Sequence, residues 1–194
     1  MDLRKAIRNR RSIRAFKDKY VKEEPIMVII DAARWAPSAN NSQPWEFLII
    51  TEPAEREWLS KLYVEAYKRV SRAELEKKEK IDKMLGVFGD QIRKPPYVIV
   101  VCGDRNRSRS YIVDCAAAIQ NMLLMAHGLG LGGSWIDLST TSLGDHFDKS
   151  MIKSRYGIPE EVEIVAILPI GFLEMMPRSP DRRAMKEVIH KGFY

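Results

Sequence analysis

Two groups of basic residues, one near each end of the sequence, could bind an anion. The first group comprises Arg10, Arg11, Ser12 and Arg14, and the second comprises Arg182 and Arg183. The planar guanidinium group of arginine matches the geometry of phosphate oxygens, and a serine hydroxyl adds a further donor. The first group therefore predicts a phosphate site, which the second pair could complete. Solvated surface charge is the alternative interpretation of both groups.

A loop of short polar residues is the second candidate. It comprises Pro37, Ser38, Ala39, Asn40, Asn41, Ser42, Gln43 and Pro44, with Trp45 directly after it. Such side chains present amide and hydroxyl groups while the prolines restrict the backbone. Amide and hydroxyl groups match the donors and acceptors of a heterocycle, and Trp45 can anchor the loop in the core. We expect a ligand-bordering loop, and a connecting loop with ordinary turn chemistry is the alternative.

The segment GLGLGG at 128–133 formally matches the glycine pattern of dinucleotide-binding proteins. That pattern must follow a strand and open a helix, so that a pyrophosphate meets the helix N-terminus. Here the glycines end a predicted helix and lead into a predicted strand. We therefore reject the dinucleotide interpretation and expect a helix C-cap followed by close backbone approach.

Other chemistry-bearing residues give weak signals. Three histidines are scattered without metal-ligand spacing: His127, His146 and His190. Ser134 does not lie in the G-x-S-x-G pattern of a hydrolase nucleophile. Cys102 and Cys115 lie in apolar segments and are expected to be inert core thiols. No metal site and no catalytic side chain are predicted, so an enzyme built on this sequence would take its chemistry from a cofactor.

Helices and strands alternate along the chain and must position these candidates. Helices are predicted at 2–9, 23–35, 112–129 and 142–156, and strands at 45–50, 97–102, 133–138 and 163–171. Residues 185–194 have some helical character. The charged segment 54–94 is expected to be helical, with a break near Gly86 and Gly89, and to form either a solvated hairpin or a lid. This order predicts an α/β or α+β protein whose sheet is covered on both faces.

Length and composition favour one globular domain over residues 1–194, since the chain has 194 residues and domains average about 150. Hydrophobic residues make up 45% and charged residues 30%, which excludes a disordered chain. The net charge of +6 suits an anionic ligand but is too small to indicate nucleic-acid binding. The N-terminus lacks the apolar core of a signal peptide, and 164–173 is too short to span a membrane. We expect a cytoplasmic protein with neither nucleic-acid nor membrane partners.

Four segments together resemble the nitroreductase family of FMN-dependent oxidoreductases. They are RRSIRAF at 10–16, APSANNSQPWEF at 36–47, GLGLGGSWI at 128–136 and RRAMKEVIHKGFY at 182–194, in the family's order. The resemblance implies an α+β fold with a central mixed sheet flanked by helices. It also implies an interlocked homodimer with two FMN sites at the subunit interface.

The resemblance implies a role for each part of the site. Arg10 and Ser12 would contact the FMN phosphate with Arg182 or Arg183, and Arg14 would lie near the pyrimidine edge of the flavin. The 37–43 loop would come from the other subunit, and backbone groups around 137–138 would lie near flavin N5 and O4. The predicted cofactor-binding residues are Arg10, Arg11, Ser12, Arg14, Pro37, Ser38, Ala39, Asn41, Gln43, Asp137, Leu138, Arg182 and Arg183.

The activity implied by the resemblance is ping-pong hydride transfer on flavin N5. NADH or NADPH would reduce the flavin, and a nitroaromatic, a quinone or another flavin would reoxidise it. Water could supply the protons, so no dedicated side-chain acid or base is needed. The alternative within the same fold is a flavin- or deazaflavin-binding module without steady NAD(P)H turnover. A basic nucleic-acid binder is a third hypothesis, based solely on the charge.

Overall fold

The computed structural model describes residues 2–72 and 78–193 and confirms the α+β class. The strands are β1 (Trp45–Ile50), β2 (Tyr97–Asp104), β3 (Gly132–Gly133), β4 (Ile136–Asp137) and β5 (Val162–Gly171). The α-helices are α1 (Leu3–Asn9), α2 (Glu23–Arg34), α3 (Pro53–Arg72), α4 (Lys78–Arg93), α5 (Tyr111–Gly128), α6 (Ser142–His146) and α7 (Lys149–Tyr156). Short 3-10 helices are η1 (Ala39–Asn41) and η2 (Met185–Glu187).

The strands form one sheet in the order β1-β2-β5-β3, with β4 also paired to β5. The ladders between these strands are antiparallel. A mixed sheet was expected. Within the described residues, its parallel pairing is a single bridge between Ser12 and Gly133. β2 is buried along nearly its whole length. Its run of β-branched residues, without alternation, follows from apolar cover on both faces.

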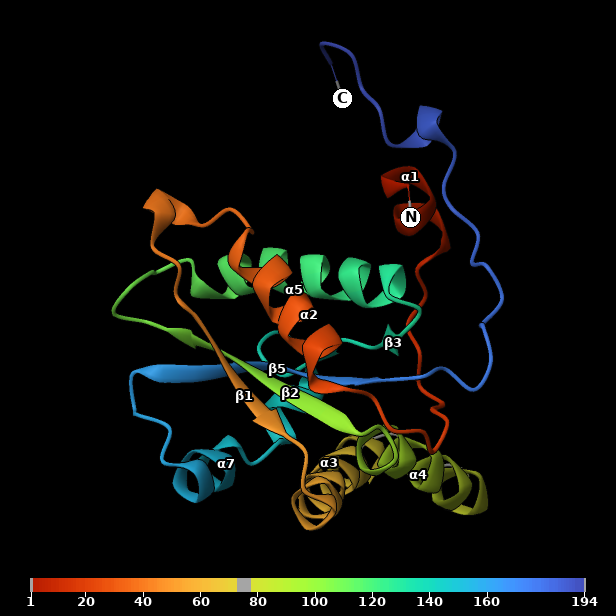
Figure 1. The fold of residues 1–194 in the computed structure, drawn as a ribbon, viewed down its shortest axis with the longest axis vertical. Helices are drawn as coiled ribbons and strands as arrows, with labels where there is room; N and C mark the ends of the chain where they lie inside the picture. Colours follow the sequence, from red (N-terminus) through yellow and green to blue (C-terminus); the bar gives the residue numbers. More distant parts are fainter. Residues whose placement is uncertain (1, 73–77, 194) are drawn as a thin grey trace.

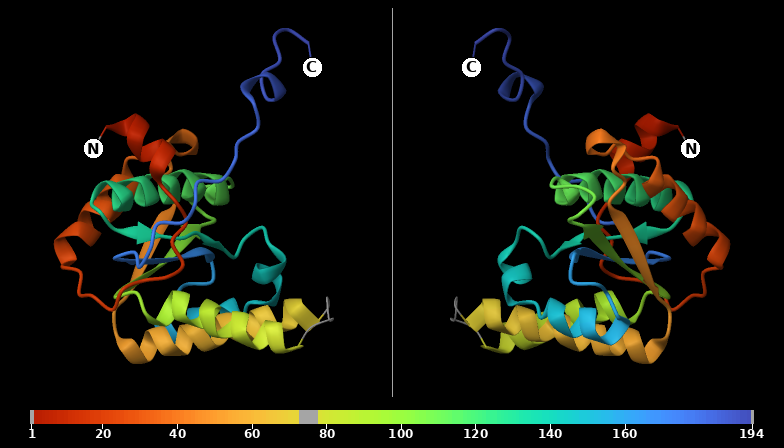
Figure 2. Two further views of the ribbon diagram at one scale, coloured as in Figure 1. Left: turned by 90° about the vertical axis from the view of Figure 1, so that its right-hand side faces the viewer. Right: turned by 90° about the vertical axis from the view of Figure 1, so that its left-hand side faces the viewer.

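Helices cover both faces of the sheet, as the alternation of elements predicts (Figure 1). α2 and α5 lie on one face, where Ile29 and Ile119 are buried against the sheet. α3, α4 and α7 lie on the other face, where Leu59, Ile92 and Ile152 belong to a second apolar core (Figure 2). Burial on each side therefore stabilises the same strands, which carry the segments of the candidate site.

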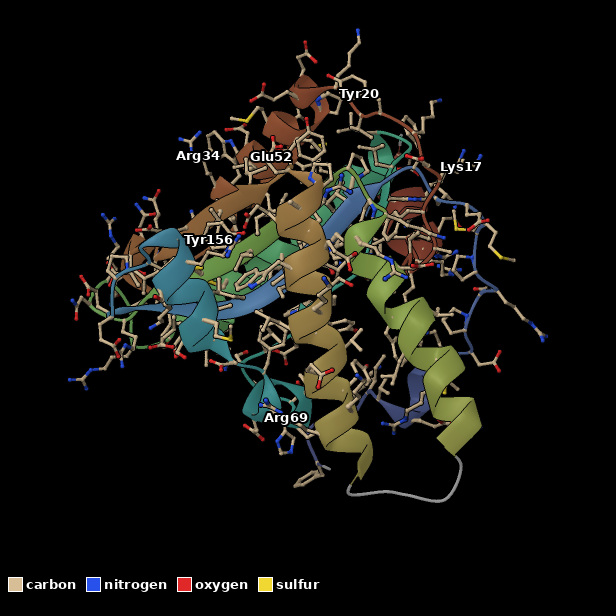
Figure 3. All side chains as sticks on the ribbon, turned by 90° about the horizontal axis from the view of Figure 1, so that it is seen from below. Lys17, Tyr20, Arg34, Glu52, Arg69 and Tyr156 are labelled. Carbon is tan, nitrogen blue, oxygen red and sulfur yellow. The ribbon has the colours of Figure 1, made fainter. Side chains whose placement is uncertain are left out.

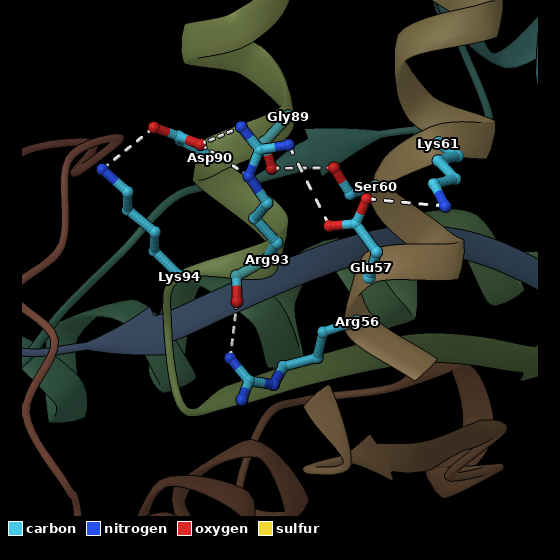
Figure 4. A network of polar contacts seen from close by, with 8 residues as sticks. All are labelled: Arg56, Glu57, Ser60, Lys61, Gly89, Asp90, Arg93 and Lys94. Carbon is cyan, nitrogen blue, oxygen red and sulfur yellow. Dashed lines mark hydrogen bonds and ion pairs between the residues drawn. The ribbon is translucent and has the colours of Figure 1, made fainter. Parts of the chain in front are cut away.

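The charged segment between β1 and β2 forms two helices, α3 and α4, that pack together beneath the sheet (Figure 3). The expected break at Gly86 and Gly89 is wrong, because both lie inside α4. A Cβ at Gly89 would lie 3.1 Å from Ser60 Oγ, and this hydroxyl donates to the Gly89 carbonyl at 2.9 Å (Figure 4). The missing side chain thus permits close helix packing. Residues 73–77 of this segment lie outside the described residues.

Arg56 fastens the C-terminal end of α4 to the start of α3. Its Nη1 donates to the carbonyl oxygen of Arg93 at 2.6 Å (Figure 4). Nη1 also donates to the carbonyl oxygen of Pro95 at 2.7 Å, and Nε donates to that of Thr51 at 3.1 Å. A cation at this point satisfies carbonyl groups that a helix end leaves without partners. The contact fixes the turn by which the chain enters β2.

Three further expectations need correction. The strand expected over 133–138 is divided into β3 and β4, because buried Ser134 leaves the sheet to accept a 2.6 Å hydrogen bond from Gln91 Nε2 of α4. The helix expected over 142–156 is divided into α6 and α7, since Asp148 caps α7 by accepting from the Met151 amide. The tail has η2 alone, because its exposed side chains lack the packing that stabilises short helices.

Beyond β5 the chain extends away from the sheet as an arm that ends far from it (Figure 2). Most residues of 174–193 are exposed, and Phe193 is 92% exposed. Among the described residues, no helix combines the length and apolar character needed to cross a membrane.

Candidate functional site

Arg10 and Arg11 are neighbours in sequence but differ in their surroundings. The Arg11 guanidinium donates to the Arg8 carbonyl at 2.7 Å, the Arg10 carbonyl at 2.8 Å and Ser179 Oγ at 2.5 Å. Arg10 Nε, by contrast, is buried and has no hydrogen-bond partner among the described residues. Burial lowers the pKa of Arg10, and the charges of Arg11 and Arg182 lower it further. Because a guanidinium stays charged in proteins, this buried Nε–H needs an acceptor, and an anion is one group that could supply it.

Arg10 lies in a small hollow between the end of α5, strand β3 and the start of the tail. Its walls are Arg10, Arg11, Ile13, Leu123, His127, Leu131, Gly132, Gly133, Leu173 and Met176. The Ile13 amide donates to the Gly133 carbonyl at 2.9 Å, which joins the arginine segment to β3. A Cβ at Gly132 would lie 2.4 Å from Ile13 Cγ1. These glycines serve close backbone approach, as expected, and not a dinucleotide pyrophosphate.

His127 also lines this hollow, and its imidazole can titrate near neutral pH. Burial lowers its pKa, and the positive charges of Arg10 and Arg11 lower it further. The scattered positions of the three histidines gave no signal of a site at His127. Its place is explained by the helix: α5 ends at Gly128, so its last turn carries His127 toward the arginines.

The structure distinguishes the two arginines of the tail. Arg182 lies near enough to Arg10 for its charge to lower the pKa of Arg10. Arg183 instead donates to the Glu187 carbonyl at 2.6 Å and pairs with the Glu187 carboxylate at 3.7 Å. Direct contact between the tail and the first basic group is made by the hydrogen bond from Arg11 to Ser179, and Arg182 itself donates to the Asp181 carbonyl at 3.0 Å.

Arg14 and the 137–138 segment lie further along the same edge. Arg14 is exposed, and its charge reaches the buried Tyr63 of α3, whose pKa burial raises. The Leu138 amide donates to the Val165 carbonyl at 2.9 Å, so this N–H is satisfied within the chain. Burial raises the pKa of Asp137, but hydrogen bonds from Thr140 and Ser139 outweigh it and hold that pKa below its ordinary value.

The 37–43 loop lies at the opposite end of α5 (Figure 1). Three of its residues have left-handed backbone conformations without being glycine: Asn40 at φ 51°, Asn41 at φ 55° and Gln43 at φ 47°. Most of the loop is exposed, whereas Trp45 is buried and anchors it as expected. The loop therefore presents polar groups to solvent from a fixed base.

Sequence reasoning missed Asp114, which holds this loop. The carboxylate is 5% exposed and accepts a hydrogen bond from the Ala39 amide at 3.0 Å. An acidic residue on a helix whose neighbours are small and apolar was the available signal, because a buried carboxylate needs partners.

The two thiols have the inert character expected of them. Cys102 and Cys115 are free and buried, and burial raises the pKa of each to about 12. Neither is a thiolate at neutral pH. Within the described ranges, no cluster of three or more His, Cys, Asp or Glu side chains could hold a metal ion.

This geometry defines an α+β protein with an arginine-rich edge and a polar loop, and comparisons with known proteins identify its family. The Nitroreductase family model matches residues 7–172. A Methanothermobacter thermautotrophicus protein named "Putative NADH dehydrogenase/NAD(P)H nitroreductase" is 32% identical over 184 residues, covering 93% of this chain and 82% of that protein. The chain belongs to the nitroreductase family of oxidoreductases.

Solved structures agree with this assignment. One from Desulfovibrio desulfuricans, described as "a putative nitroreductase in complex with fmn", is 26% identical with a TM-score of 0.76, covering 100% of this chain and 98% of that chain. An FMN-dependent nitroreductase from Clostridium difficile R20291 shares the fold, with a TM-score of 0.77 and 23% identity over 99% of this chain and 100% of that chain.

Proposed function

We propose that this enzyme uses NADH or NADPH to reduce nitroaromatics, quinones or flavins by ping-pong hydride transfer. The observation that carries the proposal is the buried, unpartnered Nε of Arg10 in a hollow shaped by glycines. A phosphate monoester suits these arginines chemically, because its oxygens accept charge-assisted hydrogen bonds and its charge would offset theirs. The hollow of about 10 Å³ holds no more than one water-sized group, so we place the phosphate at its mouth, beside the guanidinium. Because the chain belongs to the nitroreductase family and an FMN complex of a relative is known, we assign this position to the phosphate of FMN.

Within this site, the residues have separate tasks. We assign phosphate binding to Arg10, Ser12 and Arg182, and we assign Arg11 the task of holding the tail through Ser179. Arg14 would face the pyrimidine edge of the flavin. Bound FMN supplies the group that accepts hydride from the nicotinamide and returns it to the acceptor. The protein holds and orients this group, and water supplies protons at the exposed face.

We propose that two copies form a homodimer. An apolar groove between α1, α2 and α5 is lined by Leu3, Ala6, Ala32, Trp35, Asn121, Leu124, Met125, Gly128 and Leu129. Trp35 is 81% exposed and Leu3 is 66% exposed. Contiguous apolar surfaces of this kind mark protein interfaces. The exposed arm carries Met185, Val188 and Phe193, which could cover such a surface on the partner.

The separation of the two binding segments also supports a dimer. Asp114 and His127 mark the ends at which the loop and the arginines lie, and they are thirteen residues apart on α5. At ~1.5 Å per residue the separation is about 20 Å along the helix axis. We therefore propose that the 37–43 loop borders the flavin bound beside the arginines of the other copy.

Two further assignments belong to this proposal. We propose a single domain over 1–194, since both apolar cores rest on one sheet. A lid role for the 54–94 segment stays a prediction. We also propose a cytoplasmic location, supported by two free, buried cysteines and no disulfide among the described residues.

The test is an anaerobic reductive titration of the purified protein. We expect a yellow protein whose flavin absorption bleaches with NADH or NADPH and returns with a quinone or a nitroaromatic. A colourless protein that ignores added FMN would contradict the proposal. Flavin binding without reduction by either nicotinamide would favour a flavin- or deazaflavin-binding module instead.

A further inference from the structure

We propose that Asp114 is a positioning residue that clamps the 37–43 loop in the conformation needed beside the flavin ring. The inference rests on the proposed function, since that function places the loop at the ring. Asp114 lies in the first turn of α5 and is buried. It touches the loop and not the phosphate end of the site, so it would act through the loop.

The carboxylate of Asp114 joins the 37–43 loop and Ser108 to helix α5. Oδ1 accepts from the Ala39 amide at 3.0 Å, although these residues are 75 positions apart in sequence. Oδ2 accepts from Ser108 Oγ at 2.6 Å and from Ser42 Oγ at 3.5 Å. The Ser108 hydroxyl thereby orients the carboxylate, and the carboxylate fixes both sides of η1.

The loop needs such an anchor because its backbone is strained. Asn40, Asn41 and Gln43 adopt positive φ, which costs free energy in residues with a Cβ. A strained conformation persists when its surroundings fix it, and strain of this kind is concentrated at functional sites. These three side chains are exposed, so packing contributes little to holding them. Hydrogen bonds within the loop, from the Gln43 amide to Ser38 Oγ and from the Asn41 amide to the Ser38 carbonyl, both at 3.0 Å, hold its turns. The buried carboxylate adds the contact that ties the loop to α5.

Asp148 provides a contrast that separates this role from ordinary helix capping. Asp148 accepts from the Met151 amide at 3.3 Å and Ser150 Oγ at 2.6 Å, both in its own helix α7. Asp114 also has the favourable position of an acidic residue near a helix N-terminus. Its partners Ala39 and Ser42, however, belong to the loop. Asp148→Ala is therefore a matched control for Asp114→Ala.

The first measurement is hydrogen exchange in the flavin-free protein, followed in peptides that contain residues 37–43. We expect Asp114→Ala to speed exchange there by about tenfold or more, because a hydrogen bond to a charged group is lost. Asp148→Ala should leave these peptides unchanged. Asp114→Asn keeps an acceptor for the Ala39 amide and should restore part of the protection.

The second measurement is the affinity for FMN and for riboflavin. Asp114→Ala should weaken both by about tenfold and change the visible absorption band of the bound flavin, while leaving the ratio of the two affinities unchanged, because the phosphate end stays intact. Wild-type protein that binds neither flavin would overturn the proposed function and this role with it. If wild type binds FMN and Asp114→Ala matches it in exchange, spectrum and affinity, the role alone is overturned.

Discussion

Two candidate binding segments lie at the two ends of α5, and they are built on different physical principles. Near the C-terminal end of α5, the charged Arg10 lines a small hollow, and its Nε has no hydrogen-bond partner among the described residues. At the N-terminal end of α5, a strained loop with no charged residue is fixed by the carboxylate of Asp114. The arginine end would attract a phosphate by its charge, and the loop end would hold a ring by its fixed backbone conformation. Changes at the first should therefore alter how tightly a phosphate binds, and changes at the second should alter how the ring is held.

The largest effect is expected from Arg10→Ala combined with Arg182→Ala. FMN affinity should fall by about 3 to 6 kcal/mol, since each charge-assisted hydrogen bond contributes about 1.5 to 3 kcal/mol. Riboflavin affinity should stay nearly constant because riboflavin lacks the phosphate. Titration by flavin fluorescence measures both. Arg183→Ala is the matched control, because Arg183 pairs with Glu187; an equal loss in that control would show that the phosphate lies elsewhere.

The next effect tests how backbone packing supports the arginine end. Gly132→Ala places a Cβ 2.4 Å from Ile13 Cγ1, so the segment that carries Arg10 must shift. We expect unfolding free energy to fall by about 1 to 3 kcal/mol, as overpacking usually costs, together with weaker FMN binding. Urea unfolding measures the stability. Gly86→Ala has open space within α4 and should instead stabilise by up to about 1 kcal/mol; equal destabilisation of both variants would contradict this account.

A smaller effect tests the strain at the loop end. Gln43 has φ 47°, a conformation that glycine adopts without penalty. Gln43→Gly should therefore be more stable than Gln43→Ala by about 1 kcal/mol in thermal or urea unfolding. The comparison between two small residues cancels the loss of the Gln43 side chain. Equal stability of the two variants would mean that the left-handed conformation is absent in solution.

The smallest effect concerns pH at the arginine end. Because the folded pKa of His127 is lowered by burial and by Arg10 and Arg11, the unfolded chain binds a proton at higher pH than the folded chain does. Stability should thus be full above the ordinary histidine pKa and decline as the pH falls through it. Urea midpoints between about pH 7.5 and 5.5 measure this decline. His127→Gln should reduce it, and an unchanged decline would assign the effect to other groups.

Sequence patterns predict the elements whose signals are local. Asp2 does cap α1, and β1 occupies the predicted residues 45–50 between its two prolines. The α5 helix follows from its helical periodicity, and the buried β2 and β5 strands follow from their continuous apolar runs, apart from one or two terminal residues. Tertiary contacts decide the rest. Gly89 taken alone predicts a helix break, but in the structure its missing side chain permits close contact between α4 and Ser60 of α3.

The candidate site divides in the same way. Residue types alone indicated an anion site at Arg10 and Ser12, because guanidinium and hydroxyl groups suit phosphate. They could not show that Arg11 donates to Ser179 of the tail, since that contact depends on where the tail runs. Asp114 was not predicted for the same reason, because its partner Ala39 is 75 positions away in sequence.

The crystal structure of the FMN-loaded protein is the measurement that tests the central claim most directly. We expect the FMN phosphate within hydrogen-bonding distance of Arg10 Nε, with the ring bordered by the 37–43 loop of a second copy. A phosphate bound away from the N-terminal arginines would contradict the account. So would a flavin enclosed by one copy alone.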